Sequence, residues 1–242
     1  MARKRLDILL VEKGLAESRE KAQAMVMAGD VMVNESVIVK PSAPVDETAS
    51  ISLVERLPFV GRGGLKLDHA LNESHLDVRG LIAVDVGAST GGFTDCMLQR
   101  GVKKVYAVDV GYGQLDYRLR KDLRVVVMER VNARYPLNLP ELVDLATLDL
   151  SFISLKKVIP SVALSVKLSG GMIALVKPQF EAERGEVGKG GIIKDPQLHA
   201  RILGRFISWA VNSGYSLRGL VPSPILGASG NREFFVLLKK LK

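Results

Sequence analysis

Two hydrophobic patterns follow one another along the 242-residue chain. In the first 60 residues, apolar positions with helical spacing come first, and short stretches that alternate between apolar and polar residues follow. A serine before the second helical stretch is a suitable N-cap, and a glycine ends each helical stretch. The pattern predicts helices from Leu6 to Gly14 and from Ser18 to Gly29, a strand pair at 31–33 and 37–39, and a further strand at 49–54.

Beyond Gly80, near-continuous apolar runs alternate with polar stretches of helical spacing. Such runs are typical of parallel strands that are covered on both faces. The alternation predicts an α/β fold with a largely parallel, seven-stranded sheet. The expected strands are 81–86, 104–110, 124–128, 143–149, 171–176, 215–221 and 234–238, and the expected helices include one that ends at residue 98 and one at 196–211.

These patterns predict two domains with a short connection. Residues 1–57 are expected to form a small α+β domain, and residues 65–242 the larger α/β domain. Between them, Pro58 and three glycines within the next six positions predict a linker at 58–64.

The composition is that of a folded protein and excludes several classes. Apolar residues make up 47% and charged residues 25% of the chain, as in globular proteins. The single cysteine, Cys96, excludes an intrachain disulfide and a cysteine-rich zinc site, and we expect no metal. Asp7 and Glu12 interrupt the apolar run near the start, and Lys167 interrupts the best candidate span, Val158 to Val176. We therefore expect neither a signal peptide nor a stable membrane association, and a cytoplasmic location.

The formal net charge of +8 is unevenly distributed. Residues 1–60 carry 8 basic and 9 acidic side chains, so the excess positive charge lies in the larger domain. Within the small domain, however, basic residues gather at the starts of both helices. Clustered cations of this kind indicate either a phosphate-binding face or a solvated helix face.

The small domain resembles the S4 RNA-binding domain. The resemblance is carried by Arg5-Leu6-Asp7, Leu10, Gly14, Ser18-Arg19, Ala22, Gly29, Val31, Val33-Asn34, Val39 and Lys40-Pro41. Glu35 departs from that family, which usually has glycine after the asparagine, and so alters the hairpin turn. The resemblance implies contacts to structured RNA through Arg3, Lys4, Arg5, Arg19, Lys21 and Lys40, and Arg62 of the linker is a candidate phosphate contact.

A glycine-rich turn, Gly87 to Gly92, follows the first strand of the larger domain. In a parallel sheet such a turn lies at the carboxyl edge, where its backbone can approach a ligand and offer N–H groups. Asp109 follows 22 positions after Gly87, at the end of the next strand, which suits hydrogen bonding to the ribose of a nucleoside cofactor. Ser89 stands where a dinucleotide fingerprint has its middle glycine, so a pyrophosphate is less well accommodated.

The segment Asp85-Val86-Gly87 resembles the first motif of class I, Rossmann-like S-adenosylmethionine methyltransferases. A dinucleotide-dependent enzyme remains the alternative. The resemblance implies S-adenosyl-L-methionine as cofactor, held by Asp85, Gly87, Ala88, Ser89, Gly91, Gly92, Phe93, Asp109, Val110, Asn132 and Asp149.

Residues that follow the later strands narrow the choice of methyl acceptor. Amine-methylating enzymes of this class commonly carry Asn/Asp-Pro-Pro-aromatic after the fourth strand, and Asp149 to Phe152 lacks the prolines. A pyrimidine C5 methyltransferase needs a nucleophilic cysteine, whereas Cys96 is expected to be a buried packing residue. A sugar hydroxyl remains, which needs help with its proton and with the developing alkoxide. Charged residues that a parallel-sheet site could collect for this purpose are Lys66, Asp149, Lys177 and Glu233, although Lys177 could instead merely cap the sheet.

These four residues resemble the Lys-Asp-Lys-Glu tetrad of the FtsJ-type ribose 2′-O-methyltransferases. The chain as a whole is similar to the TlyA family, also called the hemolysin A family, through the segments 61–67, 85–95, 110–115 and 177–181. The resemblance implies 2′-O-methylation of a ribose in ribosomal RNA, with cytidine targets in the family and ribosomal subunits as partners. It also implies Lys177 as general base or alkoxide stabiliser, positioned by Asp149 and Glu233, with Lys66 as an added positive charge. A membrane-active hemolysin and an inactive rRNA-binding protein remain as alternatives.

Overall fold

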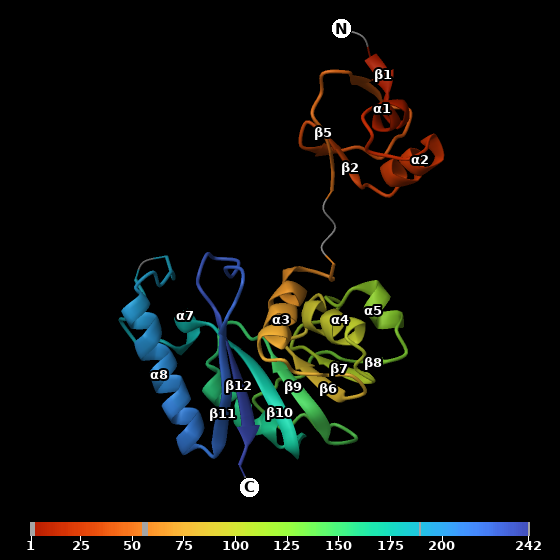
Figure 1. Cartoon of the computed structure of the whole chain (residues 1–242). Helices are drawn as coiled ribbons and strands as arrows, with labels where there is room; N and C mark the ends of the chain where they lie inside the picture. The colour runs from red at the N-terminus through yellow and green to blue at the C-terminus, as the bar shows by residue number, and fades with distance from the viewer. Residues whose placement is uncertain (1–2, 55–57, 189, 242) are drawn as a thin grey trace. The chain divides into compact units, whose positions relative to one another are not determined.

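The chain forms two compact units, Met1–Leu57 and Pro58–Lys242 (Figure 1). The computed structural model describes residues 3–54, 58–188 and 190–241. Each unit has its own hydrophobic core.

The first unit packs two helices against short antiparallel strands. Its core consists of side chains from both helices and two strands, namely Leu6, Leu9, Leu10, Ala22, Val26, Val31 and Val45. Ser18 caps the second helix as predicted, since its hydroxyl oxygen accepts a hydrogen bond from the Lys21 N–H at 3.2 Å. β3–β2–β5 form one sheet and β1–β4 a second pair, which the sequence pattern did not predict. The elements are β1 (Arg3–Arg5), α1 (Leu6–Glu12), α2 (Arg19–Met27), β2 (Val31–Val33), β3 (Ser36–Val37), β4 (Pro44–Asp46) and β5 (Ile51–Leu53).

The turn between β2 and β3 uses left-handed backbone at two residues in succession. Asn34 has φ 46° and Glu35 has φ 66°. Two-residue hairpin turns of this hand favour Asn-Gly because glycine adopts positive φ without a steric penalty. Glu35 therefore keeps the hairpin but carries backbone strain.

The second unit is built on a seven-stranded sheet in the order β11-β12-β10-β9-β6-β7-β8. β12 runs antiparallel to both of its neighbours and β10, β9, β6, β7 and β8 pair in parallel, so the predicted fold class is confirmed. β10 begins five residues earlier than predicted, because its first residues are partly exposed and paired irregularly before Gly171. The strands are β6 (Ile82–Val86), β7 (Lys104–Val108), β8 (Val125–Met128), β9 (Val143–Leu148), β10 (Val166–Val176), β11 (Tyr215–Pro222) and β12 (Phe234–Lys240).

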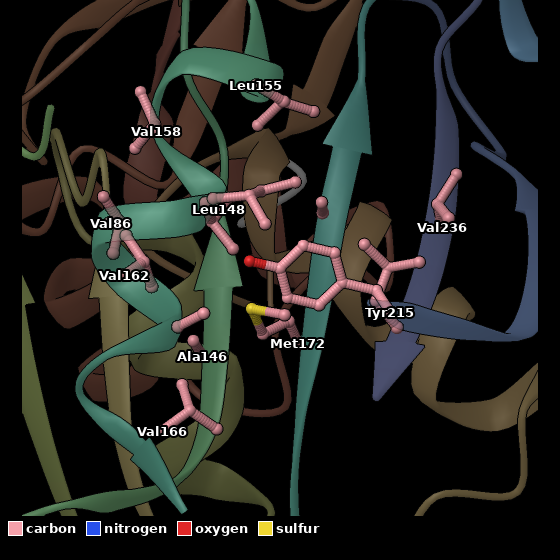
Figure 2. Close-up of a cluster of buried hydrophobic side chains, with 14 of the residues drawn as sticks. Val86, Ala146, Leu148, Leu155, Val158, Val162, Val166, Met172, Tyr215 and Val236 are labelled. Carbon is pink, nitrogen blue, oxygen red and sulfur yellow. The ribbon is translucent and has the colours of Figure 1, made fainter. Parts of the chain in front are cut away.

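Helices cover both faces of this sheet (Figure 1). On one face the core is formed with α3 (Arg62–Glu73), α4 (Gly92–Gln99) and α5 (Tyr117–Lys121). On the other it is formed with the 3₁₀ turn η1 (Leu155–Lys157), α6 (Ile159–Ala163) and α8 (Pro196–Asn212), and α7 (Pro178–Glu181) follows β10. Figure 2 shows part of this second core, in which Tyr215 lies among side chains that include Leu148, Met172 and Val236.

The expected linker at 58–64 is instead packed into the second unit. The Val60 N–H donates to the Asp95 carboxylate at 2.8 Å, and the Gln99 side-chain amide donates to the Pro58 carbonyl at 2.8 Å. A Cβ on Gly64 would lie 2.3 Å from the Phe59 side chain. The glycines in this segment thus permit close packing and the start of α3, which the sequence alone cannot distinguish from a flexible tether.

Candidate active site

Two adjoining cavities lie at the carboxyl edge of the parallel strands. The larger has a volume of about 510 Å³ and lies beyond the ends of β6, β7 and β9. The smaller, of about 180 Å³, lies between the glycine-rich turn and the start of α3. Gly87, Ser89 and Asp149 line both.

A third hollow lies away from these residues. Its volume is about 610 Å³, and it is lined at the opposite edge of the sheet by residues such as Leu76, Asp144 and Gly170. No residue predicted from the sequence to act in catalysis or binding lines it. We therefore assign the site to the carboxyl edge, where the charged and glycine-rich segments meet.

The glycine-rich turn is shaped by close backbone approaches. Gly87 has φ 85°, and a Cβ there would lie 2.3 Å from the Asp149 carbonyl oxygen. The Asp109 carboxylate accepts hydrogen bonds from the Ser89 N–H at 2.8 Å and from the Gly111 N–H at 2.7 Å. Asp109 therefore ties the turn after β6 to the turn after β7, and these two turns form the walls of the larger cavity.

Most of the residues predicted to contact a cofactor line one of the two cavities. These are Gly87, Ala88, Ser89, Gly92, Phe93, Asp109, Val110, Asn132 and Asp149.

Asp85 and Gly91, the other two residues predicted to contact a cofactor, line neither cavity. Asp85 is fully buried, and its carboxylate accepts hydrogen bonds from the Thr94 hydroxyl at 2.7 Å and the Thr147 hydroxyl at 2.9 Å. Burial raises the pKa of Asp85 to about 6. A Cβ on Gly91 would lie 2.2 Å from the Leu119 side chain, so this glycine permits packing against α5.

Lys66 and Glu233 form a buried ion pair. The Lys66 Nζ lies 2.5 Å from the Glu233 Oε2, and the two side chains are 9% and 3% exposed. Lys66 comes from the second turn of α3, while Glu233 directly precedes β12. A Cβ on Gly227 would lie 2.3 Å from the Glu233 Oε1, so a glycine there leaves room for the carboxylate.

Lys177 forms a second ion pair, with Asp149. The Lys177 Nζ lies 2.7 Å from the Asp149 Oδ1 and donates a hydrogen bond to the Ser151 hydroxyl at 3.0 Å. Lys177 directly follows β10, and Asp149 directly follows β9. The Asp149 N–H donates to the Val86 carbonyl at 3.0 Å, which holds this acid beside the glycine-rich turn.

Strand pairing brings the two ion pairs together. Val176 and Phe234 are the last paired residues of β10 and β12, so Lys177 and Glu233 lie one position beyond them on neighbouring strands. Because β12 is antiparallel, its amino end meets the carboxyl ends of the parallel strands. Lys66, Asp149, Lys177 and Glu233 thus share one edge of the sheet, as the sequence interpretation required.

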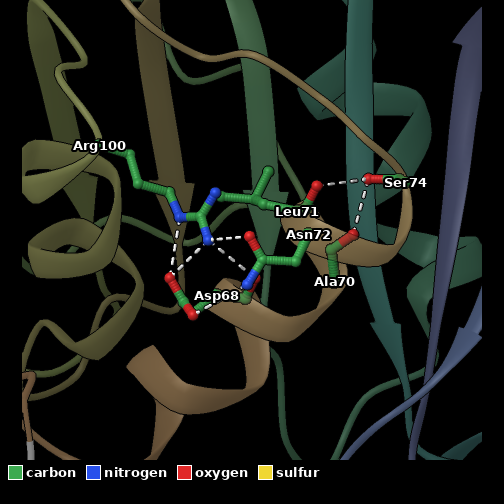
Figure 3. A network of polar contacts seen from close by, with 6 residues as sticks. All are labelled: Asp68, Ala70, Leu71, Asn72, Ser74 and Arg100. Carbon is green, nitrogen blue, oxygen red and sulfur yellow. Dashed lines mark hydrogen bonds and ion pairs between the residues drawn. The ribbon is translucent and has the colours of Figure 1, made fainter.

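A polar network fixes the helix that carries Lys66 (Figure 3). Arg100, which caps α4, donates to the Asp68 carboxylate at 2.7 Å and 2.8 Å and to the Asn72 side-chain amide oxygen (Oδ1) at 2.6 Å. Both acceptors lie on α3. The network joins α3 to α4, and so couples the position of Lys66 to that of the glycine-rich turn at the start of α4.

Phe152 and Ser151 are site residues that the sequence reasoning did not single out. Phe152 lines the larger cavity, is 91% exposed and has φ 64°, an unusual conformation for a bulky residue. Its ring centroid lies 5.2 Å from that of Phe180. The available signal was the position of Phe152 in the segment after the fourth strand, where related enzymes carry an aromatic residue.

The basic residues of the first unit are organised around one buried acid. Asp7 is fully buried, and its carboxylate accepts hydrogen bonds from Arg5 at 2.8 Å and 3.0 Å, from Arg19 at 3.1 Å and from Gln23 at 2.9 Å. The Arg5 guanidinium holds the pKa of Asp7 well below its usual range. Asp7 therefore fixes the two arginines while their side chains stay about half exposed, at 43% and 52%.

The other predicted RNA contacts differ in their surroundings. Lys4 pairs with Glu12 at 3.0 Å and with Glu47 at 3.5 Å, and Lys21 pairs with Glu17. Three further candidates are exposed, namely Arg3, Lys40 and Arg62.

Three other features were sought in the described residues: a reactive cysteine, a metal site and a membrane-spanning helix. Cys96 is buried, and burial raises the pKa of its thiol to about 12. The described ranges contain no group of three or more His, Cys, Asp or Glu residues that could hold a metal ion. Of the helices described, none is both long and apolar enough to cross a membrane.

Comparison with known proteins agrees with the two units. The family model of the S4 domain matches residues 4–51, and that of the FtsJ-like methyltransferases matches residues 59–240.

Individual relatives match almost the whole chain. YqxC of Bacillus subtilis (strain 168) is 50% identical over 240 residues, which cover 98% of this chain and 85% of that protein. The 16S/23S rRNA (cytidine-2′-O)-methyltransferase TlyA of Mycobacterium tuberculosis (strain ATCC 25618 / H37Rv) is 44% identical over 244 residues, which cover 99% and 91%. A solved structure from Streptococcus thermophilus has 44% identity and a TM-score of 0.76, and covers 100% of this chain and 90% of that one.

Proposed function

The chain belongs to the TlyA family, in which an S4 domain precedes an FtsJ-like methyltransferase domain, and we propose that it methylates a ribose 2′-hydroxyl of ribosomal RNA. It is an S-adenosylmethionine-dependent rRNA methyltransferase, with cytidine as the target nucleoside. The observation that carries the proposal is the meeting of two lysine–carboxylate pairs at the sheet edge that also bears the glycine-rich turn.

The cavities suit S-adenosylmethionine. Together they are lined by the glycine-rich turn, where a Cβ on Gly87 would collide with the Asp149 carbonyl oxygen, and by Asp109, the acid that follows β7. Asp109 would accept hydrogen bonds from the ribose of the cofactor, because each of its oxygens retains a free lone pair beside its backbone donor. Asn132 and Val110 would border the adenine, and Gly87 to Phe93 would border the methionine end. When bound, the cofactor supplies an electrophilic methyl group on a sulfonium.

The lysine–carboxylate pairs act on the acceptor oxygen. In its neutral form, the Lys177 amine takes the proton of the ribose hydroxyl; the ammonium that results, paired with Asp149, stabilises the charge that develops on the oxygen. Asp149 and Ser151 orient the Lys177 amine. Lys66 adds positive charge at the same edge of the sheet, and Glu233 holds Lys66 in place. Fixing the hydroxyl at a near-attack distance contributes up to about 7–11 kcal/mol in favourable cases.

The remaining features serve RNA recognition. Arg5 and Arg19, held by Asp7, present guanidinium groups that suit phosphate oxygens. The exposed ring of Phe152 lies at the mouth of the larger cavity and offers a flat surface to a nucleobase, as aromatic side chains do in many RNA-binding proteins.

A labelled-methyl assay tests the function directly. Purified protein and labelled S-adenosylmethionine are incubated with unmodified small and large ribosomal subunits, and the modified nucleotide is mapped. The expected product is a 2′-O-methylated cytidine. Label on a base, or no label on either subunit in spite of cofactor binding by calorimetry, would overturn the proposal, and the second result would indicate an inactive rRNA-binding protein. Lysis of protein-free liposomes would instead support a membrane-active protein.

A further inference from the structure

Glu181 carries a buried carboxylate close in sequence to Lys177, and it takes no part in the proposed methyl transfer. Glu181 is the last residue of α7, the short helix that directly follows Lys177, and it is 8% exposed. Its Oε2 accepts a hydrogen bond from the Ser154 hydroxyl at 2.7 Å. Its Oε1 accepts one from the Leu155 N–H at 2.6 Å.

Burying the Glu181 carboxylate costs free energy that an apolar side chain at this position would not cost. Among the described residues, Glu181 forms no ion pair within 4.0 Å. The Ser154 hydroxyl and the Leu155 N–H compensate for its burial, and the positive charge of Lys156 makes a smaller contribution. Burial raises the pKa of this carboxyl. A carboxylate is nevertheless the side chain that accepts on two separate oxygens, whereas the amide of glutamine has one acceptor oxygen.

The two donors end the loop that carries the functional residues after β9. That loop runs from Asp149 to Leu155 and includes Ser151 and Phe152. It lies beside the segment 177–181. Three successive contacts join the two segments: Lys177 with Asp149 and Ser151, Phe180 with Phe152, and Glu181 with Ser154 and Leu155.

Of these contacts, only the one made by Glu181 involves no residue that lines the larger cavity. The Lys177 contacts belong to the catalytic groups, and the Phe180–Phe152 contact involves a ring that is 91% exposed. The Phe152 backbone is also strained, at φ 64°, so the loop needs an anchor beyond it to keep this conformation. Glu181 supplies that anchor.

We propose that Glu181 is a positioning residue, which holds the 149–155 loop so that Asp149 and Ser151 face Lys177 and Phe152 stays at the cavity mouth. The proposal rests on the proposed function, because the positioned groups are those that act on the ribose hydroxyl. Loss of the anchor should slow turnover and weaken the use of RNA, while the glycine-rich turn and Asp109, which lie on other elements, continue to hold the cofactor.

The test compares Glu181→Ala, Glu181→Gln and a matched control, Glu141→Ala. Glu141 precedes β9 and accepts hydrogen bonds from the Lys104 amine and the Tyr106 hydroxyl, each at 2.7–2.8 Å, so its truncation also removes two hydrogen bonds. For each variant, kcat and KM on ribosomal subunits, the Kd for S-adenosylmethionine by calorimetry, the melting temperature and amide hydrogen exchange of residues 149–155 are measured.

We expect Glu181→Ala to lower kcat about 100-fold, the effect of displacing a catalytic group by about 1 Å. The cofactor Kd should change much less, because Asp149 is the one loop residue predicted to contact the cofactor. Exchange in 149–155 should become faster. Glu181→Gln keeps one acceptor and should recover most of the lost turnover, while Glu141→Ala should melt lower than the wild type but turn over normally.

Two results would overturn the proposal. One is a Glu181→Ala variant with wild-type kcat and wild-type exchange in 149–155. The other is a loss of turnover that follows melting temperature equally in Glu181→Ala and Glu141→Ala. Should Glu181→Ala not fold, a Glu181→Gln variant whose kcat falls about 100-fold while exchange in 149–155 stays at the wild-type rate would also contradict it. If the wild-type protein itself transfers no methyl group, the proposed function fails, and the exchange measurement alone still decides whether Glu181 holds the loop.

Discussion

Replacing Lys66 with methionine separates the contribution of its ion pair to stability from its contribution to catalysis. At the observed Nζ–Oε2 distance of 2.5 Å, an effective dielectric constant of about 20 gives an attraction of about 7 kcal/mol. The cost of removing both charges from water offsets most of this attraction. The pair as a whole therefore contributes little to stability, but Glu233 without its partner would be a buried charge with no compensation.

Lys66→Met should accordingly destabilise the second unit by about 3–5 kcal/mol, the usual cost of breaking a buried pair. For a unit of this size, that loss corresponds to a decrease in melting temperature of about 6–20 °C. The double variant Lys66→Met/Glu233→Gln carries no buried charge and should melt close to the wild type. Both variants should fail to methylate ribosomal RNA, because the positive charge beside Lys177 is absent.

Thermal unfolding followed by circular dichroism, together with the labelled-methyl assay, checks both parts. A Lys66→Met protein that melts within about 2 °C of the wild type would refute the burial argument, since even a loss of about 1 kcal/mol produces such a shift. Normal turnover by the stable double variant would show that these two residues take no part in the reaction.

Four further predictions concern other parts of the molecule. Lys177→Ala should reduce methyl transfer by at least about 100-fold while calorimetry shows nearly unchanged cofactor binding, and undiminished turnover would contradict its assignment. Phe152→Ala should raise the KM for ribosomal subunits about tenfold or more, by loss of base stacking, and an unchanged KM would argue against stacking there. The pKa of Asp85 is raised from 3.8 to about 6, so between these values the folded protein binds more protons than the unfolded chain, and the free energy of unfolding falls as pH rises. In the wild type, the free energy of unfolding measured with urea should therefore be lower at pH 7 than at pH 4, by on the order of 3 kcal/mol. Asp85→Asn should abolish this difference, and the same pH dependence in the variant and the wild type would refute the argument. Glu35→Gly should stabilise the first unit by about 1 kcal/mol, because glycine relieves the strain of positive φ, and a lower melting temperature would contradict that explanation.

The sequence was most informative where one rule links a position in the chain to a position in space. Acids and lysines directly after parallel strands must lie at the same edge of the sheet, and Asp149 and Lys177 do. Glu233 lies at this edge only because the last strand is reversed, and hydrophobic pattern alone does not predict that reversal; Glu233 entered the prediction through the family resemblance. The roles of these residues in catalysis stay predictions until the variants are measured.

The sequence was least informative where a residue type serves two purposes. Asp85 has the position of a cofactor-binding acid, yet its partners are hydroxyls of Thr94 and of Thr147, the residue paired with it on β9. Similarly, the glycines at 61–64 suit both a flexible tether and a close contact between α3 and α4. The structure shows the close contact, because Gly64 packs against Phe59 and Gly92 approaches the backbone of Gly63 and Gly64. Phe152 was considered only as part of the segment that lacks the prolines, because an exposed residue with a left-handed backbone leaves no hydrophobic pattern that would mark it as a site residue.

The insertion of β12 between β10 and β11 has a consequence for the order of biosynthesis. Lys66 and Glu233 are separated by 167 positions, and the strand that brings Glu233 to its partner is the final one of the sheet. Contacts between such distant positions form only after the intervening chain is available. A nascent polypeptide therefore cannot bring its two lysine–carboxylate pairs together until β12 has been synthesised, so every earlier folding intermediate lacks a complete candidate site.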